Sequence, residues 1–245
     1  IVPPTAEKFS FKKMFQIAKS NDQLLVFMLF AMLSNAGWYM ISGVGAYYFD
    51  VVIGDPSAQS AFNTIGAVGS VLGLAVVPVM TKFTSRRRTY QFSLIMAIVG
   101  FSGTTFFASA FAEPQLMAMN LSYIIASIGV ASMFVSQTVF LADIVDYGHV
   151  KQGFRSESIT FSMKGFLQKM AYTIQTIILF SGLEISKYDE TLHAANSAGV
   201  KSAISFMMLG APIALFILSL LIFTFKFKLH GAYMDEITAK IKEIQ

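Results

Sequence analysis

The sequence predicts an all-α membrane protein that crosses the bilayer with six helices. Of its 245 residues 55% are hydrophobic and only 13% are charged, and the mean hydropathy is +0.61. Soluble domains contain about 25% charged and roughly 45–50% apolar residues. Because a helix needs about 20 apolar residues to cross the hydrocarbon core, the long uncharged stretches of this chain are candidate spans.

Six candidate spans follow one another along the chain. Each of the first four contains an uncharged stretch that is long enough to cross a bilayer. The fifth is interrupted only by Lys164 and Lys169, and the sixth is again uncharged. The predicted spans, which form a six-helix transmembrane domain over residues 23–226, are residues 24–49, 58–81, 89–112, 115–147, 157–183 and 202–226.

The basic residues predict the orientation. Most of the 18 lysines and arginines lie before the first span, after the second and fourth, or after the sixth. Because such residues remain on the cytoplasmic side, a multi-pass protein of the cell membrane with both termini in the cytoplasm is expected. Residues 1–22 are then a cytoplasmic linker and residues 227–245 a cytoplasmic tail. In the tail Met234, Ile237 and Ile241 share one helical face, which favours a short amphipathic interfacial helix over a dedicated partner site.

Composition and motifs argue against other classes of protein. The chain has no cysteine, so it holds neither a disulfide nor a thiolate metal site. Its net charge of +4 is spread over several short loops, which does not make a nucleic-acid surface. His149, His193 and His230 lie far apart, and the sequence has no HExxH or GxSxG pattern. We therefore expect no enzyme, no cofactor, no resident metal and no nucleic-acid partner.

Small and aromatic residues mark two of the spans. Gly66, Gly69 and Gly73 lie on one face of the second span, which predicts close packing of another helix there. Trp38, the only tryptophan, lies past the middle of the first span. Its indole either stacks on a ligand or packs in the bundle, and packing is the simpler interpretation.

Two lysines lie inside the fifth span. A cation at bilayer depth costs at least about 2.5–3.5 kcal/mol and usually faces a cavity or a partner. Lys169 lies about 15 Å along the helix from Ile159, close to the membrane midplane, which favours a functional role over a structural ion pair. Lys164 is shallower, and a side chain that extends to the headgroups explains it as well as a functional role does.

The stretch ADIVDYGHVKQGFRSES, residues 142–158, concentrates charge between two apolar runs. Asp143, Asp146 and Tyr147 are spaced i, i+3 and i+4, so they share one helical face. Gly148 is expected to end that helix. Two carboxylates then lie side by side at its cytoplasmic end.

Basic residues across the loop predict ion pairs with these carboxylates. Arg155 precedes the fifth span, where Ser156 can cap the helix and Glu157 suits its positive end. A solvated loop is one interpretation, in which each pair contributes at most about 1 kcal/mol. The other is a latch that opens and closes as helices rock. The predicted cytoplasmic gate comprises Asp143, Asp146, Tyr147, Arg155, Glu157, Lys151, Arg86, Arg87 and Arg88.

The same stretch resembles a motif of the glycoside–pentoside–hexuronide:cation symporters, a melibiose permease-like family of the major facilitator superfamily. The elements that carry the resemblance are the ADxVDYG run at residues 142–148, Arg155-x-Glu157, Phe161-Ser162 and Lys169. The resemblance implies a fold of twelve helices in two six-helix halves, of which this chain is the C-terminal one. It also implies secondary active transport of a sugar or glycoside, coupled to H⁺ or Na⁺ by alternating access.

The resemblance also implies roles for single residues. It places Asp143, Asp146 and Arg155 in the cytoplasmic gate, Lys169 in sugar recognition and Phe134 beside the sugar. Phe134 lies about 13–14 Å along the helix from Asp143, which puts it at the depth of Lys169. An aromatic face and a hydrogen-bond donor at one depth suit a sugar ring. The predicted substrate-binding residues are Lys169, Phe134, Lys164 and Gln168.

The departures from the family pattern bear on the substrate and on the coupled ion. His149 stands where melibiose permease has an acidic residue, and Phe154 stands where lactose-transporting members have a histidine linked to proton coupling. Lys164 and Gly165 replace polar positions linked to galactoside contacts. The additional cation at Lys164 therefore indicates a hexuronide or another anionic glycoside.

Two alternatives to a transporter half remain open on the sequence. A non-transporting membrane scaffold also has six spans and basic loops, but it has little use for a lysine at the midplane. A homodimer of six-helix chains is the other, because the two halves of this fold are parallel repeats. The expected partners are a sugar or glycoside, the lipid bilayer and either the N-terminal six-helix half or a second copy of the chain.

Overall fold

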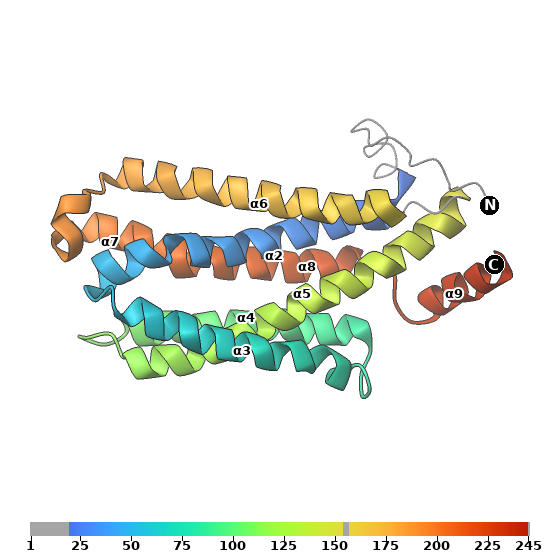
Figure 1. Cartoon of the computed structure of the whole chain (residues 1–245), viewed down its shortest axis with the longest axis horizontal. Coiled ribbons are helices and arrows are strands. Elements are labelled where there is room, and N and C mark those ends of the chain that lie inside the picture. The colour runs from blue at the N-terminus through green and yellow to red at the C-terminus, as the bar shows by residue number, and fades with distance from the viewer. Residues whose placement is uncertain (1–19, 154–156, 245) are drawn as a thin grey trace, which may run out of the picture.

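The computed structural model describes residues 20–153 and 157–244, and within these ranges it contains helices and no strands. Figure 1 shows a bundle of long helices that run roughly along one axis. The elements are α2 (Asp22–Tyr47), η1 (Tyr48–Ile53), α3 (Ala58–Met80), α4 (Arg86–Ser109), α5 (Leu116–Gln152), α6 (Glu157–Ser186), η2 (Glu190–Ala195), α7 (Ala198–Ser205), η3 (Phe206–Gly210), α8 (Ala211–Lys226) and α9 (Ala232–Ile244).

Long helices lie at all six predicted positions, and five of them are long and apolar enough to cross a membrane. These five, among the described residues, are Asp22–Ile53, Ala58–Met80, Arg86–Ser109, Leu116–Gln152 and Ala198–Lys226. Six apolar spans were predicted, and α6 is the exception. It is a helix of 30 residues, about 45 Å long, but polar side chains such as Gln168, Lys169 and Gln175 lower its hydropathy.

The end of α5 differs from the prediction. The helix does not stop at Gly148 but continues to Gln152, and Gly153 caps it with a left-handed φ of 77°. The amide of Gly153 donates to the carbonyl of His149 at 2.9 Å, which satisfies one of the last carbonyls of the helix. The prediction for Gly148 was therefore wrong, because the later glycine is the one that adopts the left-handed conformation.

The helices form two groups, which are connected by α4 packing against α8 and by α5. Helix α2 packs against α6 and α8, whereas α3 and α4 pack against α5. Figure 1 shows α5 running obliquely from the α3 and α4 side toward α6 and α9. An aromatic cluster of Phe30, Tyr90, Phe140, Phe223 and Phe227 joins α2, α4, α5 and the last span, with ring centroids 4.4–5.7 Å apart. These rings are buried.

The glycines of α3 bring its backbone against α5. A Cβ atom on Gly69 would lie 2.8 Å from the carbonyl oxygen of Ile124, and one on Gly73 would lie 2.5 Å from that of Ile128. Ser132 of α5 donates to the carbonyl of Gly73 at 2.9 Å. The predicted close packing at these glycines is confirmed, because a larger residue would force the two helices apart.

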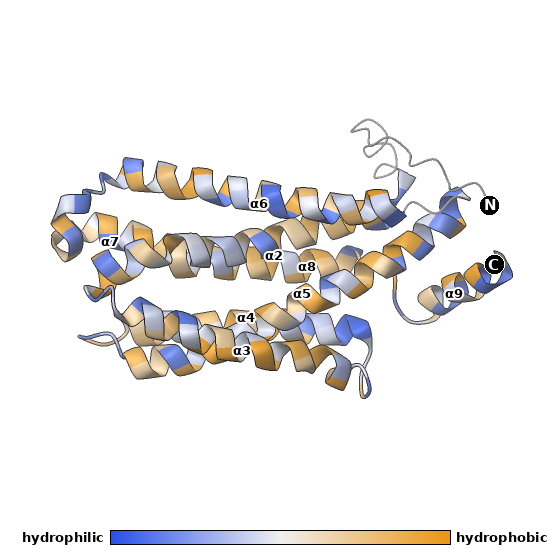
Figure 2. Cartoon of the chain, in the orientation of Figure 1, coloured by the Kyte–Doolittle hydropathy of each residue, from blue (hydrophilic) through white to orange (hydrophobic). Residues whose placement is uncertain are grey.

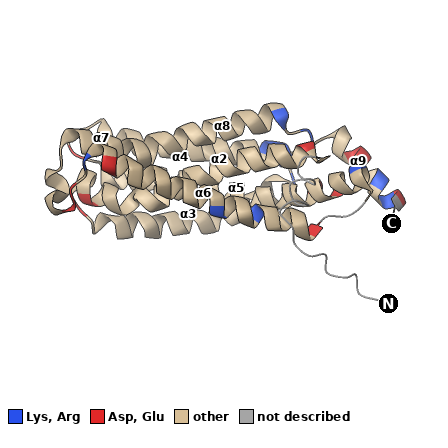
Figure 3. Cartoon of the chain, turned by 90° about the horizontal axis from the view of Figure 1, so that it is seen from above, with Lys and Arg blue, Asp and Glu red and all other residues tan. Residues whose placement is uncertain are grey.

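The surface divides by polarity along the bundle. Figure 2 shows many apolar residues along the long helices, with polar ones interspersed in α6, and Figure 3 shows most charged residues gathered at the two ends. We call these the α9 end, where α5 finishes, and the α7 end. Large apolar side chains such as Val71, Phe106 and Ile177 are exposed along the sides. Such a surface suits lipid, and the chain is a multi-pass membrane protein.

Candidate functional site

An ion pair joins α4 and α5 at the α9 end. Arg86 Nη1 lies 2.8 Å from Asp143 Oδ1, and the side chain of Asp143 is 8% exposed while that of Arg86 is 58% exposed. Ser85 caps α4 by accepting from the amide of Arg88 at 3.3 Å, so the helix begins beside Asp143. The largely buried carboxylate is thus neutralised by a cation that also reaches solvent.

A second cluster ties the start of α2 to α5. Asp22 Oδ1 accepts from Tyr147 Oη at 2.7 Å and from Lys151 Nζ at 2.6 Å. Lys151 also donates to Tyr147 Oη at 3.1 Å, as their i, i+4 spacing on α5 allows. Asn21 caps α2 by accepting from the amide of Leu24 at 3.0 Å, and its Nδ2 donates to a carbonyl of α5 at 3.2 Å. Two predicted gate residues therefore pair with an aspartate that the sequence left at the edge of the linker.

Arg87 has a different neighbourhood from Arg86. Its guanidinium contacts Nε2 of His230 and the carbonyl oxygen of Thr224, at the end of α8. Gln91 Nε2 donates to Thr224 Oγ1 at 2.9 Å on the same side of α4. Arg88 is exposed. Of the three predicted arginines, Arg86 thus faces the acidic pair and Arg87 holds the segment that leads to α9.

The remaining predicted gate residues are Asp146, Glu157 and Arg155. Asp146 lines a pocket of about 380 Å³ together with Asp143, Arg86, Arg87 and residues of α9. Glu157 begins α6, where its charge suits the positive end of the helix. Arg155 lies outside the described residues. No group of three or more His, Asp or Glu side chains in the described ranges could hold a metal ion.

His230 makes the attachment of α9 sensitive to pH. Partial burial and the neighbouring Arg87 hold the pKa of His230 below its usual value of 6.5. Because a guanidinium only donates, the ring nitrogen that it contacts is unprotonated. The unfolded chain binds a proton at His230 more readily than the folded chain does. The contribution of this contact to the stability of the fold is therefore complete above pH 6.5 and is lost as the pH falls through the lowered pKa of His230. The charged groups that line the same pocket are Arg86, Arg87, Asp143, Asp146 and Asp235.

We expect α9 to detach more readily on acidification. Amide hydrogen exchange in α9 should become faster between about pH 7 and pH 5, after correction for the intrinsic pH dependence of exchange. The variant His230→Gln cannot titrate in this range, so it should lose most of that change. The same change in wild type and variant would contradict this role for His230.

The polar residues at the middle of α6 line a cavity with α2. Gln168 and Lys169 share a cavity of about 560 Å³ with Tyr39 and Tyr172. The two tyrosine rings meet edge to face, with centroids 5.7 Å apart. Lys169 is exposed within this chain although it lies midway along a helix of the bundle. The cavity combines aromatic rings, an amide and a cation, which are the groups that bind polar organic ligands.

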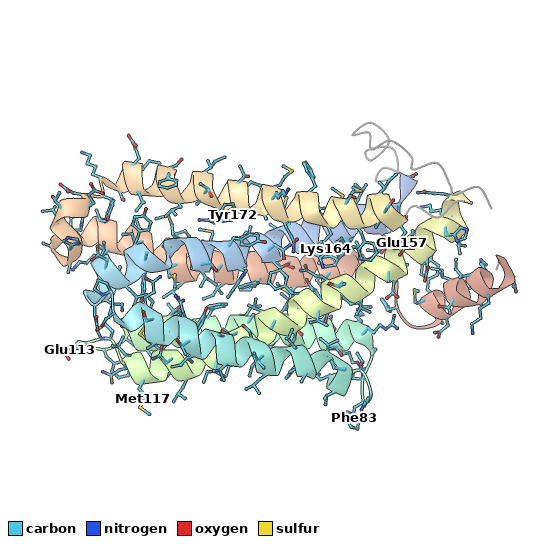
Figure 4. The ribbon with its side chains drawn as sticks, in the orientation of Figure 1. Phe83, Glu113, Met117, Glu157, Lys164 and Tyr172 are labelled. Carbon is cyan, nitrogen blue, oxygen red and sulfur yellow. The ribbon has the colours of Figure 1, made fainter. Side chains whose placement is uncertain are left out.

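Lys164 contacts α5, whereas Lys169 lines the cavity with α2. Its Nζ donates to Thr138 Oγ1 of α5 at 2.6 Å, and Thr138 in turn donates to the carbonyl of Phe134 at 3.1 Å. Phe134 packs partly buried against the core and does not line the cavity of Lys169. Figure 4 shows Lys164 and Tyr172 on the side of α6 that faces α5 and α2. The structure therefore brings Lys169 and Gln168 together and links Lys164 to the helical turn of Phe134.

Sequence reasoning missed three residues of these sites. Tyr172 follows Lys169 at i+3 on one face of α6, a spacing that was visible in the sequence. Tyr39 and Asp22 carried no such signal, because their partners lie more than a hundred residues away. Only the packing of α2 against α5 and α6 brings them into the sites.

A multi-pass helical bundle with ion-paired helix ends and a polar, aromatic cavity halfway along it has the features of a membrane transporter. The chain belongs to the MFS/sugar transport protein family, whose model matches residues 3–231. The match confirms the resemblance to the glycoside–pentoside–hexuronide:cation symporters of the major facilitator superfamily.

Curated relatives are similar over nearly the whole chain. The lactose permease of Lactobacillus delbrueckii subsp. bulgaricus is 23% identical over 94% of this chain and 37% of its own length. The raffinose carrier protein of Pediococcus pentosaceus is 23% identical over 94% of this chain and 35% of its own length. The inner membrane symporter YicJ of Escherichia coli is 24% identical, with shares of 82% and 43%. The chain thus spans less than half the length of these relatives, which are transporters and not enzymes, as predicted.

Proposed function

We propose that this chain is the C-terminal six-helix half of a symporter that carries a sugar or glycoside across the cell membrane by alternating access. The observation that carries the proposal is the cavity of Lys169, Gln168, Tyr39 and Tyr172 midway along α6. The names of the relatives, a lactose permease and a raffinose carrier, support a sugar as the substrate. A cation at this depth is costly unless it faces a cavity or a partner, which supports a binding role for Lys169.

In this proposal α6 also crosses the membrane and completes the six spans. Its polar residues face the transport pathway instead of lipid, which accounts for its lower hydropathy. The α9 end then faces the cytoplasm, together with both termini, because the connection before α4 and the end of α8 carry basic residues.

The ion pairs at the α9 end have a mechanical role in this proposal. Asp22 joins α2 to α5, and Arg86 joins α4 to α5, so these helix ends move as one body. When the two halves rock, this body presents Asp146 to the partner half. Alternating access then follows from rigid-body rocking about a central binding site.

The coupled ion, H⁺ or Na⁺, is the only co-transported species that the proposal requires. The free energy of the ion gradient drives sugar transport if the transporter rocks when both sugar and ion are bound, and does not rock when only one of them is bound. The name of the relative YicJ, an inner membrane symporter, supports coupling. We assign the ion-binding groups to the other half of the transporter.

Counterflow in proteoliposomes tests this function. Vesicles should contain the chain with and without the half that precedes it, and labelled galactoside, pentoside and glucuronide are the probes. Saturable exchange that needs both halves is the expected result. Exchange by this chain alone would instead favour a homodimeric half-transporter, and no exchange in either preparation would favour a scaffold.

Substitution of Lys164 tests whether the substrate is charged. If this cation binds an anionic glycoside, Lys164→Gln should lower glucuronide uptake about tenfold and leave neutral glycosides nearly unchanged. Thr138→Val is the matched control, because it removes the acceptor of Lys164 at 2.6 Å but keeps the charge. Equal losses for charged and neutral substrates in Lys164→Gln would show that the lysine only joins α6 to α5.

A further inference from the structure

A second cavity lies on the other side of α2 from Lys169. It measures about 360 Å³ and is lined mainly by α2 and α3, with Tyr123 of α5 and Met208 of η3 among the other residues. Trp38 and Ser42 contribute from α2, and Gln59 and Asn63 from α3, along with the buried ring of Phe62. None of the lining residues is charged.

The polar residues of this cavity form one row on α3. Gln59, Asn63 and Ser70 line the cavity, whereas the exposed residues Val68 and Leu72 lie on a different face of the helix. Asn63 is exposed, although α3 is apolar enough to span a membrane. A carboxamide that faced hydrocarbon would lose its hydrogen bonds to water at a cost of several kcal/mol. This row is therefore not a lipid-facing surface.

The two amides are free to bind a ligand. Within the described residues neither Gln59 nor Asn63 has a hydrogen-bond partner for its side chain. Each carries both donors and an acceptor. Gln59 Nε2 lies 3.3 Å from the position that a Cβ atom on Gly45 would take, so the absence of a side chain at Gly45 gives the amide its space over α2.

Aromatic rings form the remaining wall. Phe62 and Tyr123 are stacked with centroids 3.7 Å apart and an interplanar angle of 11°. A Cβ atom on Gly66 would lie 2.4 Å from the Tyr123 ring, so this ring fits closely against α3. Trp38 is partly buried at the opposite wall. Aromatic faces with nearby amides bind the C–H face and the hydroxyls of a sugar ring, whereas an uncharged lining gives an ion no counter-charge.

The two cavities approach each other at Trp38 and Tyr39 of α2, and the second cavity extends from there toward Gly45 and Phe49 at the α7 end. Trp38 lines the α3 side and Tyr39 the α6 side, and consecutive residues differ by about 1.5 Å along a helix. At about 100° per residue, Ser42 and Ala46 project between these two aromatic residues. Both are small and exposed. A ligand of two rings can therefore lie across α2, whose diameter is about 10 Å, and reach both cavities. A ligand of one ring reaches only one of them.

We propose that the cavity between α2 and α3 binds the second sugar ring of a di- or oligosaccharide whose first ring occupies the cavity of Lys169. Trp38 stacks on this second ring, and Gln59 and Asn63 bind its hydroxyls. These three residues then set the preference for substrates of more than one ring. The proposal rests on the proposed sugar transport and adds a site to it.

Uptake of paired probes by the complete transporter tests the second site. The pairs are galactose with lactose, and xylose with xylobiose. Trp38→Ala and Asn63→Ala should raise the half-saturation concentration for the two-ring sugar by about tenfold, and that for the one-ring sugar by less than about twofold. Trp38→Phe keeps an aromatic face and should restore most of the affinity. Thr64→Ala is the matched control, because this neighbour of Asn63 is exposed and bonds only to the carbonyl of Ser60 in its own helix.

The outcomes separate the second site from the transport function itself. Equal effects on both members of a pair, or no effect of either variant, would overturn the second site. Uptake of one-ring sugars alone by the parent would also overturn it and would leave the sugar-transport proposal standing. A parent that takes up none of these four probes, and exchanges none of the galactoside, pentoside and glucuronide of the counterflow assay, would overturn sugar transport and the second site together.

Discussion

Replacing Lys169 by alanine in the complete transporter is expected to abolish measurable concentrative sugar uptake. The side chain lines the central cavity with Gln168 and two tyrosines, and a charged donor to a ligand contributes roughly 1.5–3 kcal/mol. The half-saturation concentration in counterflow should therefore rise by about tenfold to a hundredfold. Lys169→Arg should recover only part of the affinity, because a planar fork differs from a compact ammonium group.

Loss of folding would not explain this result. Removing a cation from the middle of a membrane helix makes insertion easier, so Lys169→Ala should reach the membrane in normal amounts. Met170→Ala is the matched control, because Met170 is the next residue of α6 and 40% of it is exposed. Normal uptake by Lys169→Ala would remove this lysine from the binding site, and a loss in Met170→Ala would point to a general defect of α6.

Replacing Arg86 by alanine is expected to loosen the α9 end of the bundle. The change leaves Asp143, with 8% of its side chain exposed, without the guanidinium that lies 2.8 Å away. Breaking a buried pair costs about 3–5 kcal/mol, but Arg86 is 58% exposed, so we expect about 1–3 kcal/mol. Arg86→Ala should therefore lower the temperature of thermal unfolding. It should also increase labelling of Val139→Cys, which lines the neighbouring pocket.

A double-mutant cycle isolates the contribution of the pair. Asp143→Asn removes the buried charge and nearly keeps the size of the side chain, so it should restore part of the stability that Arg86→Ala loses. Arg88→Ala is the control, because this arginine is exposed at the same helix end. The chain contains no cysteine, so it adds no background to the labelling. Additive effects of the two single variants would show that Arg86 and Asp143 do not interact.

The location of the site was predictable to the level of single helices. The depth of Lys169 follows from the rise per residue of a helix, and Asp143 and Tyr147 share a face because of their i, i+4 spacing. The pairing was not predictable. Arg155 was the expected partner of Asp143 or Asp146, with Lys151 and the run Arg86–Arg88 as further cations nearby. The described structure places Arg86 beside Asp143, while Lys151 bonds to Asp22.

The sequence alone determined that this is a membrane protein of long apolar helices, that charge gathers in the connections and that one helix carries lysines at bilayer depth. These properties depend on composition and on the period of 3.6 residues per turn, which are local in the chain. Only the tertiary structure decided that Tyr39 joins Lys169, that Trp38 faces α3 and that Asp22 receives Lys151. Such partners are set by the crossing of helices that lie far apart in sequence, and no local pattern encodes that crossing.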